Sequence, residues 1–272
     1  MKYTTKKICI PASERKLKLL ILSPKNKSTD RTCVLWIHGG GYVTGMAGMV
    51  HMSRAKNLVR KYGAVVVSPE YRLAGQAPYP AAPEDCHAAL VYLKEHAAKL
   101  GVRSDQIMVG GESAGGGLAA ALCMYEKDTD GVSIAFQMPL YPMIDCEDTE
   151  TSKDNHAPVW NTKRNRYGRE KYLAGLSGEI PCYASAARRK DYSGLPPAYT
   201  FVSTAEPFYA ETVTYIENLR AAGVPAEIDI YPGLYHAFDM LTPWRKVSKI
   251  AAERFDERFL YAQKHYFAEQ RK

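Results

Sequence analysis

Short apolar runs alternate with amphipathic segments along most of the 272-residue chain. The apolar runs predict strands buried on both faces, and they lie at Cys33–His38, Ala64–Ser68, Gln106–Gly110, Ile134–Tyr141, Ala198–Ser203 and Ala226–Tyr231. Residues 3–10 and 16–22 predict two further strands near the N-terminus. The amphipathic segments predict helices at Arg54–Tyr62, Ala81–Lys99, Ala114–Tyr125, Thr212–Ala222 and Lys246–Glu269. This alternation predicts the α/β class, with a mostly parallel central sheet flanked by helices.

Residues 145–195 interrupt this alternation. The segment is polar and rich in charge, and it contains few strand-like runs although it lies between two predicted strands. A structureless loop of this length is uncommon in a compact domain. We therefore expect a small helical cap insertion at about 145–195, lying over the strand ends, within a single domain that spans residues 1–272.

The composition is that of a globular protein with a mild excess of positive charge. Apolar residues make up 46% of the chain, and 36 Lys and Arg against 29 Asp and Glu give a net charge of +7. We interpret the partly clustered basic residues between Lys163 and Lys190 as a solvated surface. The sequence contains no nucleic-acid-binding motif, so no nucleic-acid partner is expected.

The sequence also predicts a cytoplasmic protein that has no membrane partner. The N-terminus carries charge but no apolar signal-peptide core, and no apolar run approaches the length of a membrane span. The six cysteines form no C-x-x-C pair, so we interpret them as reduced thiols and expect no metal site.

Residues Gly111–Gly115 read Gly-Glu-Ser-Ala-Gly and fit the G-x-S-x-G pattern, with a predicted strand before them and an apolar helix after them. In this context the pattern indicates a tight strand-to-helix turn. Ser113 must adopt an unfavourable backbone conformation there, and the flanking glycines leave room for the close approach of other backbone. The turn places the hydroxyl at the positive end of a helix. Ser113 is therefore the predicted nucleophile, and the Ala114 N–H is a predicted oxyanion donor.

Three consecutive glycines end the apolar run Cys33–His38, in the segment His-Gly-Gly-Gly-Tyr at 38–42. Glycines allow the backbone to turn sharply and to present N–H groups to a bound carbonyl. We expect Gly40 and Gly41 to complete an oxyanion hole. His38 precedes the predicted nucleophile in the chain, so we expect it to hold the loop by hydrogen bonds and not to act as the base.

A general base is expected after the nucleophile in the chain, and His156, His236 and His265 are the candidates. His265 lies among charges in the predicted terminal helix, and His156 lies in the predicted cap. His236 follows the strand Ala226–Tyr231, which places it at the carboxyl end of a strand, where ligands bind to parallel sheets. We therefore predict His236 as the base.

The acid that orients the base is expected at another strand end. Glu206 follows the strand Ala198–Ser203, where its carboxylate can fix the histidine tautomer and stabilise the imidazolium. Glu211, Asp229 and Asp239 are the competing acids, but their positions are less favourable. They lie on the next helix, inside a strand and very close to the histidine in sequence, respectively.

Together these motifs resemble those of the hormone-sensitive lipase family of α/β-hydrolases. The resemblance runs from about residue 30 to the C-terminus and rests on 38–42, Tyr71–Asp85, 111–116, Tyr183–Ala198 and Tyr235–Phe238. The sequence departs from the family at Glu206-Pro207-Phe208, where Asp-Pro-Leu is usual, and at Glu112, where Asp is common.

The resemblance implies an α/β-hydrolase fold and a carboxylic ester hydrolase with a Ser113–His236–Glu206 triad and an acyl-enzyme intermediate. It also implies a small-molecule ester substrate, no cofactor and a homodimer. Only about 30 residues precede the strand at Cys33, where family members often carry a longer helical lid segment. We therefore expect a small cap, an open site and a preference for short, acetyl-like acyl groups. An amidase, a peptidase or an acyltransferase of the same fold remains an alternative, because each would use the same triad.

Overall fold

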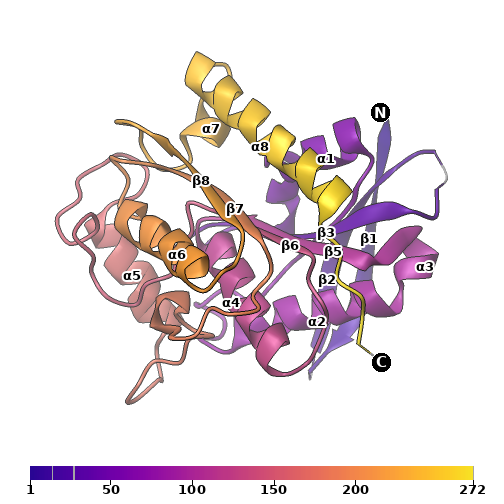
Figure 1. Cartoon of the computed structure of the whole chain (residues 1–272). Helices are drawn as coiled ribbons and strands as arrows, with labels where there is room; N and C mark the ends of the chain where they lie inside the picture. The colour runs from indigo at the N-terminus through magenta and orange to yellow at the C-terminus, as the bar shows by residue number, and fades with distance from the viewer. Residues whose placement is uncertain (14, 27, 272) are drawn as a thin grey trace.

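The computed structural model describes residues 1–13, 15–26 and 28–271 (Figure 1). The described residues form an eight-stranded sheet with the strand order β1-β2-β4-β3-β5-β6-β7-β8. The strands are β1 (Tyr3–Ala12), β2 (Arg15–Pro24), β3 (Arg31–Ile37), β4 (Val65–Pro69), β5 (Val102–Glu112), β6 (Phe136–Leu140), β7 (Ala198–Ser203) and β8 (Ala226–Tyr231). Strand β2 runs antiparallel to both of its neighbours, and β3 to β8 are parallel to one another. This topology confirms the predicted α/β class with a mostly parallel sheet.

Helices cover both faces of the sheet. In Figure 1, α1 (Ala55–Tyr62) and α8 (Lys246–His265) lie above the sheet, and α2 (Ala81–Glu95), α4 (Ala114–Asp128) and α6 (Tyr209–Ala221) lie below it. Each face therefore has its own apolar core. The remaining helices are η1 (Ala47–His51), α3 (Ala97–Leu100), α5 (Thr162–Tyr172), η2 (Ala186–Arg188) and α7 (Phe238–Leu241).

Two predicted helices differ from the observed ones. The helix expected at Ala81–Lys99 is interrupted at His96, whose ring stacks on Tyr92, so that α2 and the single turn of α3 replace it. The helix expected at Lys246–Glu269 ends at His265. The chain then turns back to the start of β5, where the N–H of Ala268 donates to Asp105 O at 2.8 Å. In the second case a contact with another element overrides the local helical pattern.

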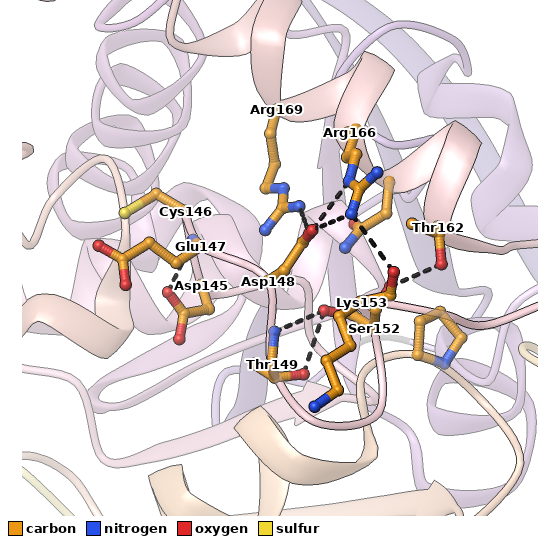
Figure 2. Close-up of polar contacts among 12 residues, drawn as sticks. Asp145, Cys146, Glu147, Asp148, Thr149, Ser152, Lys153, Thr162, Arg166 and Arg169 are labelled. Atoms are coloured by element: carbon orange, nitrogen blue, oxygen red, sulfur yellow. Dashed lines mark hydrogen bonds and ion pairs between the residues drawn. The ribbon is translucent and has the colours of Figure 1, made fainter.

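The segment 145–195 contains α5 and η2, and its other residues form turns, bends and irregular loops. Its polar side chains largely bond to one another, as Figure 2 shows around Asp148. Asp148 pairs with Arg166 and Arg169 of α5, and Thr162 at the start of that helix donates to Ser152 O at 2.7 Å. The charge that interrupts the apolar pattern thus stabilises a compact excursion from the sheet.

None of the helices in the described ranges is both long enough and apolar enough to cross a bilayer.

Candidate active site

Three strand ends bring the predicted triad residues to one edge of the sheet. Ser113 directly follows β5, Glu206 follows β7, and His236 follows β8. These strands are parallel, so their carboxyl ends meet at the same edge, where open α/β sheets bind ligands. The structure thereby brings together three residues that are distant in the sequence, since Ser113 and His236 lie 123 positions apart.

The turn at Ser113 has the strained backbone that the motif predicts. Ser113 has φ 58° and ψ −122°, an unusual conformation for a residue with a side chain, and α4 begins at the next residue. A Cβ on Gly111 would lie 2.4 Å from Ile37 O, and one on Gly115 would lie 2.1 Å from the same atom. Only glycine fits at these two positions, so the sequence pattern is a direct requirement of the turn.

A hydrogen-bond chain joins the three side chains. Ser113 Oγ lies 2.9 Å from His236 Nε2, and Glu206 Oε2 lies against His236 Nδ1. A carboxylate only accepts hydrogen bonds, so Nδ1–H donates to Glu206, and in the neutral imidazole Nε2 then accepts from the serine hydroxyl. The side chains are almost fully enclosed, because Ser113, His236 and Glu206 are 5%, 4% and 0% exposed, respectively. This arrangement can remove a proton from the serine hydroxyl.

A second set of hydrogen bonds holds the acid and the base in position. Glu206 Oε1 accepts from the N–H of Ser203 at 2.8 Å. The Ser203 hydroxyl donates to Leu234 O at 2.7 Å and accepts from the N–H of Leu234 at 2.8 Å. These bonds join the loop after β7 to the loop after β8, which keeps Glu206 beside the imidazole.

Aromatic rings surround the His236 imidazole. Tyr141 and Phe208 approach it edge-on with centroid distances of 5.0 Å each, and Trp160 lies at 6.4 Å. Behind the first of these rings, the Tyr141 hydroxyl donates to Asp239 Oδ1 at 3.0 Å. This packing restricts rotation of the imidazole and keeps Nε2 directed towards the serine.

The glycine loop lies directly beside the nucleophile. A Cβ on Gly39 would lie 3.2 Å from Ser113 Cβ. Gly40 and Gly41 have φ values of +121° and +59°, which favour glycine, and no protein acceptor within the described ranges takes their N–H groups. Ala114 begins α4, so its N–H also lies at a helix end without an intrahelical acceptor. The N–H groups of Gly40, Gly41 and Ala114 thus remain without an acceptor among the described residues, and the assignment of these three groups as oxyanion donors stays a prediction.

His38 supports the loop, as the sequence analysis expects. Burial lowers the pKa of His38, which favours the neutral imidazole, and its Nδ1–H donates to Gly39 O at 2.8 Å. The ring stacks on Tyr71 at 4.2 Å, and the Tyr71 hydroxyl donates to His38 O at 2.9 Å. The side chain is therefore engaged in holding the backbone of the loop.

The two other histidines considered as bases lie elsewhere. The side chain of His156 is 87% exposed and pairs with Asp154 in the 145–195 segment. His265 is at the end of α8, where its ring packs against Tyr261. Neither position offers a contact with the nucleophile.

The three competing acids are engaged with other partners. Glu211 accepts from the N–H of Ile144 at 2.7 Å, and Asp229 accepts from the Tyr199 hydroxyl at 2.8 Å. Asp239 receives the tyrosine hydroxyl described above and pairs with an arginine of the loop before α1. Each of these carboxylates is therefore held away from the imidazole.

Glu112, the residue before the nucleophile, is a buried carboxyl group. Its Oε2 accepts from Trp36 Nε1 at 2.8 Å, while Oε1 is buried and has no hydrogen-bond partner in the described part of the chain. Burial raises the pKa of Glu112 to about 8. The side chain therefore favours its neutral form at neutral pH and adds little negative charge behind the serine.

The sequence analysis did not identify Trp160, although the indole forms one wall of the site. A Cβ on Gly41 would lie only 2.1 Å from Trp160 Cη2, so the ring packs directly on the glycine loop. Trp160 Nε1 donates to Asn165 Oδ1 at 3.4 Å, which ties the indole to α5. The available signal was a single tryptophan within the polar segment 145–195. Packing between distant parts of the chain places the indole against the glycine loop, and the local sequence around the tryptophan does not specify that packing.

No cluster of three or more His, Cys, Asp or Glu side chains with the arrangement of a metal site occurs among the residues that the structure describes.

Comparison with known proteins agrees with this architecture. A family model described as an alpha/beta hydrolase fold matches residues 34–240. The chain therefore belongs to the α/β-hydrolases, within the group that resembles hormone-sensitive lipase.

Proteins named as esterases and hydrolases are among its relatives. Esterase LipI of Mycobacterium tuberculosis is 34% identical over 212 residues, which are 75% of this chain and 65% of that protein. Ethyl acetate hydrolase of Pseudomonas putida is 27% identical over 208 residues, again 75% of this chain and 65% of the relative. The solved structure of a bacterial heroin esterase superposes with a TM-score of 0.88 at 31% identity, covering 93% of this chain and 82% of that one. The chain thus spans slightly less than two thirds of the length of the curated relatives.

Proposed function

We propose that the protein is a carboxylic ester hydrolase in which Ser113, His236 and Glu206 act as a catalytic triad. The observation that carries this proposal is the hydrogen-bond chain from the Ser113 hydroxyl through the imidazole to the carboxylate. Beside it lies a glycine loop in which the N–H groups of Gly40 and Gly41 have no acceptor among the residues that the structure describes. Membership of the α/β-hydrolases and relatives named as esterases support the same class of reaction.

The first half of the reaction forms an acyl-enzyme. Ser113 Oγ attacks the ester carbonyl while His236 Nε2 accepts the hydroxyl proton. The N–H groups of Gly40, Gly41 and Ala114 stabilise the oxyanion, and each such donor typically contributes about 2.7–4 kcal/mol to the transition state. The imidazolium then donates its proton to the departing alcohol as the tetrahedral intermediate collapses.

The second half of the reaction hydrolyses the acyl-enzyme. His236 removes a proton from water, the resulting hydroxide attacks the acyl carbonyl, and the same donors stabilise the second oxyanion. Protonation of Ser113 Oγ releases the carboxylic acid and restores the starting hydrogen bonds. Glu206 stabilises the imidazolium in both halves without accepting its proton.

The proposed substrates carry short, acetyl-like acyl groups. Trp160 packs against Gly41 and lies 6.4 Å from the His236 ring, so the indole occupies space next to the bound carbonyl. A bulky wall at this position limits the length of the acyl chain. The name of the relative ethyl acetate hydrolase supports an acetyl ester as the first substrate to test.

Hydrolysis of a chain-length series of p-nitrophenyl esters tests the proposal. The purified protein is expected to be most active on acetyl to butyryl esters and to react covalently with an organophosphate probe at Ser113. Ser113→Ala is expected to lose activity by at least about a thousandfold and to lose labelling, with unchanged thermal unfolding. An active or labelled Ser113→Ala variant would rule out the triad. A maximum at long chains would contradict the short-acyl preference alone.

Two further assays separate the alternatives of the same fold. A p-nitroanilide series measures amidase activity, and addition of a simple alcohol acceptor measures acyl transfer. The rate of ester hydrolysis is expected to exceed the rates of anilide cleavage and of acyl transfer to the alcohol. Anilide cleavage or transesterification faster than ester hydrolysis would reassign the reaction while leaving Ser113 as the nucleophile.

We also propose a homodimer. Strand β8 lies at the edge of the sheet, and its Ile230 side chain is 44% exposed. An exposed edge strand with an apolar side chain offers a surface for a second chain. Light scattering of the purified protein gives the mass that decides between one chain and two.

A further inference from the structure

A cavity of about 370 Å³ lies between α2, α4 and Tyr183, away from the nucleophile. Small-molecule sites typically have volumes of about 300–1,000 Å³. Helix α4 begins beside Ser113, but its residues Ala121 to Tyr125 line the cavity. At about 1.5 Å per residue, these positions lie roughly 12–18 Å along the helix from the serine. The cavity is therefore separate from the catalytic residues.

Tyrosine rings form much of the cavity wall. Tyr79, Tyr125 and Tyr183 come from three different parts of the chain, and each is only half-buried. The Tyr125 ring meets the Tyr183 ring edge-on at 5.5 Å, and the Tyr183 hydroxyl donates to Asp128 at 2.8 Å. The His87 imidazole meets Tyr125 edge-on at 5.2 Å. These contacts hold the rings in place without filling the space between them.

The ionisable groups at the cavity favour a positively charged ligand. The lining includes the Glu84 carboxylate, and no lysine or arginine is among the described residues that line the cavity. Arg72, which is not a lining residue, pairs with Glu84 and Asp85, and Arg15 lies 3.7 Å from Asp85, so both nearby guanidinium groups are already paired with carboxylates. His87 Nδ1 lies 2.5 Å from Glu126 Oε1, so this pair carries a charge of zero or −1 in either protonation state of the imidazole. No lining group therefore adds an excess positive charge.

We propose that this cavity is a second binding site, which takes a small organic cation of the alkylammonium class. The negative faces of tyrosine rings attract cations, and the apolar parts of the rings pack against the alkyl groups of such a ligand. Glu84 at the rim supplies the complementary charge. An anionic ligand is disfavoured, because it would meet this carboxylate while the nearby guanidinium groups are already paired with Glu84 and Asp85.

Calorimetric titration of the intact protein with choline tests the site. The neutral isostere 3,3-dimethylbutan-1-ol has nearly the same shape and serves as the matched ligand. Saturable binding of choline is expected, with the isostere at least tenfold weaker. If choline does not bind saturably, or if the isostere binds equally well, the proposed cation site is wrong.

Variants locate the binding within the protein. Tyr125→Leu is expected to weaken choline binding at least tenfold, and Glu84→Gln severalfold. Tyr167→Leu, which changes an exposed tyrosine on α5, and Ser113→Ala are expected to leave binding unchanged. Glu84→Gln alters an exposed side chain and so tests the charge even if Tyr125→Leu does not fold. Unchanged binding in Glu84→Gln, or loss of binding in Ser113→Ala, would overturn the proposal, and neither result depends on ester hydrolysis.

Discussion

The Trp160 indole packs on Gly41 so closely that a Cβ at position 41 would lie 2.1 Å from its Cη2 atom. Helix α5 approaches the same loop, since a Cβ on Gly168 would lie 2.7 Å from Gly41 O. The 145–195 segment thus forms a wall beside residues that bind the substrate carbonyl in the proposed mechanism. We propose on this basis that the segment acts as a cap.

Removal of the indole is expected to broaden the range of acyl chains. Trp160→Ala opens space next to Gly41, so kcat/KM for hexanoyl and octanoyl esters is expected to rise at least about tenfold relative to the acetyl ester. Trp160→Phe retains an aromatic wall and is expected to keep most of the short-chain preference. The measurement is kcat/KM across the p-nitrophenyl ester series. An unchanged chain-length profile in Trp160→Ala would show that the indole does not limit the acyl group.

Glu206→Gln is expected to lower kcat by about 10³–10⁴-fold, because a neutral amide cannot stabilise the imidazolium. Glu211→Gln is the matched control, since that carboxyl group binds the N–H of Ile144 and lies away from the imidazole. It is expected to keep kcat within about threefold. Steady-state kinetics on the acetyl ester gives both values. A larger loss in Glu211→Gln than in Glu206→Gln would show that the acid is assigned wrongly.

Asp239→Asn is expected to destabilise the fold and to leave the catalytic groups intact. Asp239 pairs with Arg54 at 2.8 Å, and the two residues are 1% and 8% exposed. Loss of one partner leaves a buried charge uncompensated, which typically costs about 3–5 kcal/mol.

Urea unfolding measures this change, and Asp154→Asn at an exposed site is the control. In the double variant Arg54→Leu/Asp239→Leu, the loss in free energy of unfolding is expected to be smaller than the sum of the losses in the two single variants, because both charges are removed together. Additive losses would indicate that the pair is not coupled.

The stability of the protein is expected to fall as the pH rises from about 5 to 8. Burial raises the pKa of Glu112 from 4.5 to about 8, so in this window the folded protein holds a proton that the unfolded chain has released. Stability is then highest below the lower pKa and decreases until the pH passes the upper one. Glu211 is expected to contribute in the same direction, because burial also raises its pKa to about 8.

Glu112→Gln mimics the neutral acid and can still accept from Trp36 Nε1. This variant is expected to have a flatter dependence of the urea midpoint on pH, with a gain over the wild type of roughly 5 kcal/mol near pH 9. Glu253→Gln, at an exposed position on α8, is expected to follow the wild type. A wild-type slope in Glu112→Gln would show that Glu112 does not hold the proton.

The positions of the strands and of the motifs along the chain were predictable from the sequence, but some helix ends were not. Buried strands carry continuous apolar runs, and the turn at Ser113 admits only glycine at positions 111 and 115, so both leave a local signal. The break at His96 and the early end of α8 at His265 leave none. The early end of α8 goes with a contact to another element, the hydrogen bond from Ala268 to Asp105.

The sequence by itself determined the α/β class, the strained serine turn, the glycine loop and the strand ends from which Glu206 and His236 project, because each depends on residues close together in the chain. Only the tertiary structure decided which carboxylate reaches the imidazole, since Glu206 and Glu211 lie only five positions apart and differ in what packs around them. It also decided that Trp160 covers Gly41 and that tyrosines from three segments enclose a second cavity. These relationships join residues far apart in the chain, and the physical reason that local patterns miss them is that they arise only when distant elements pack together.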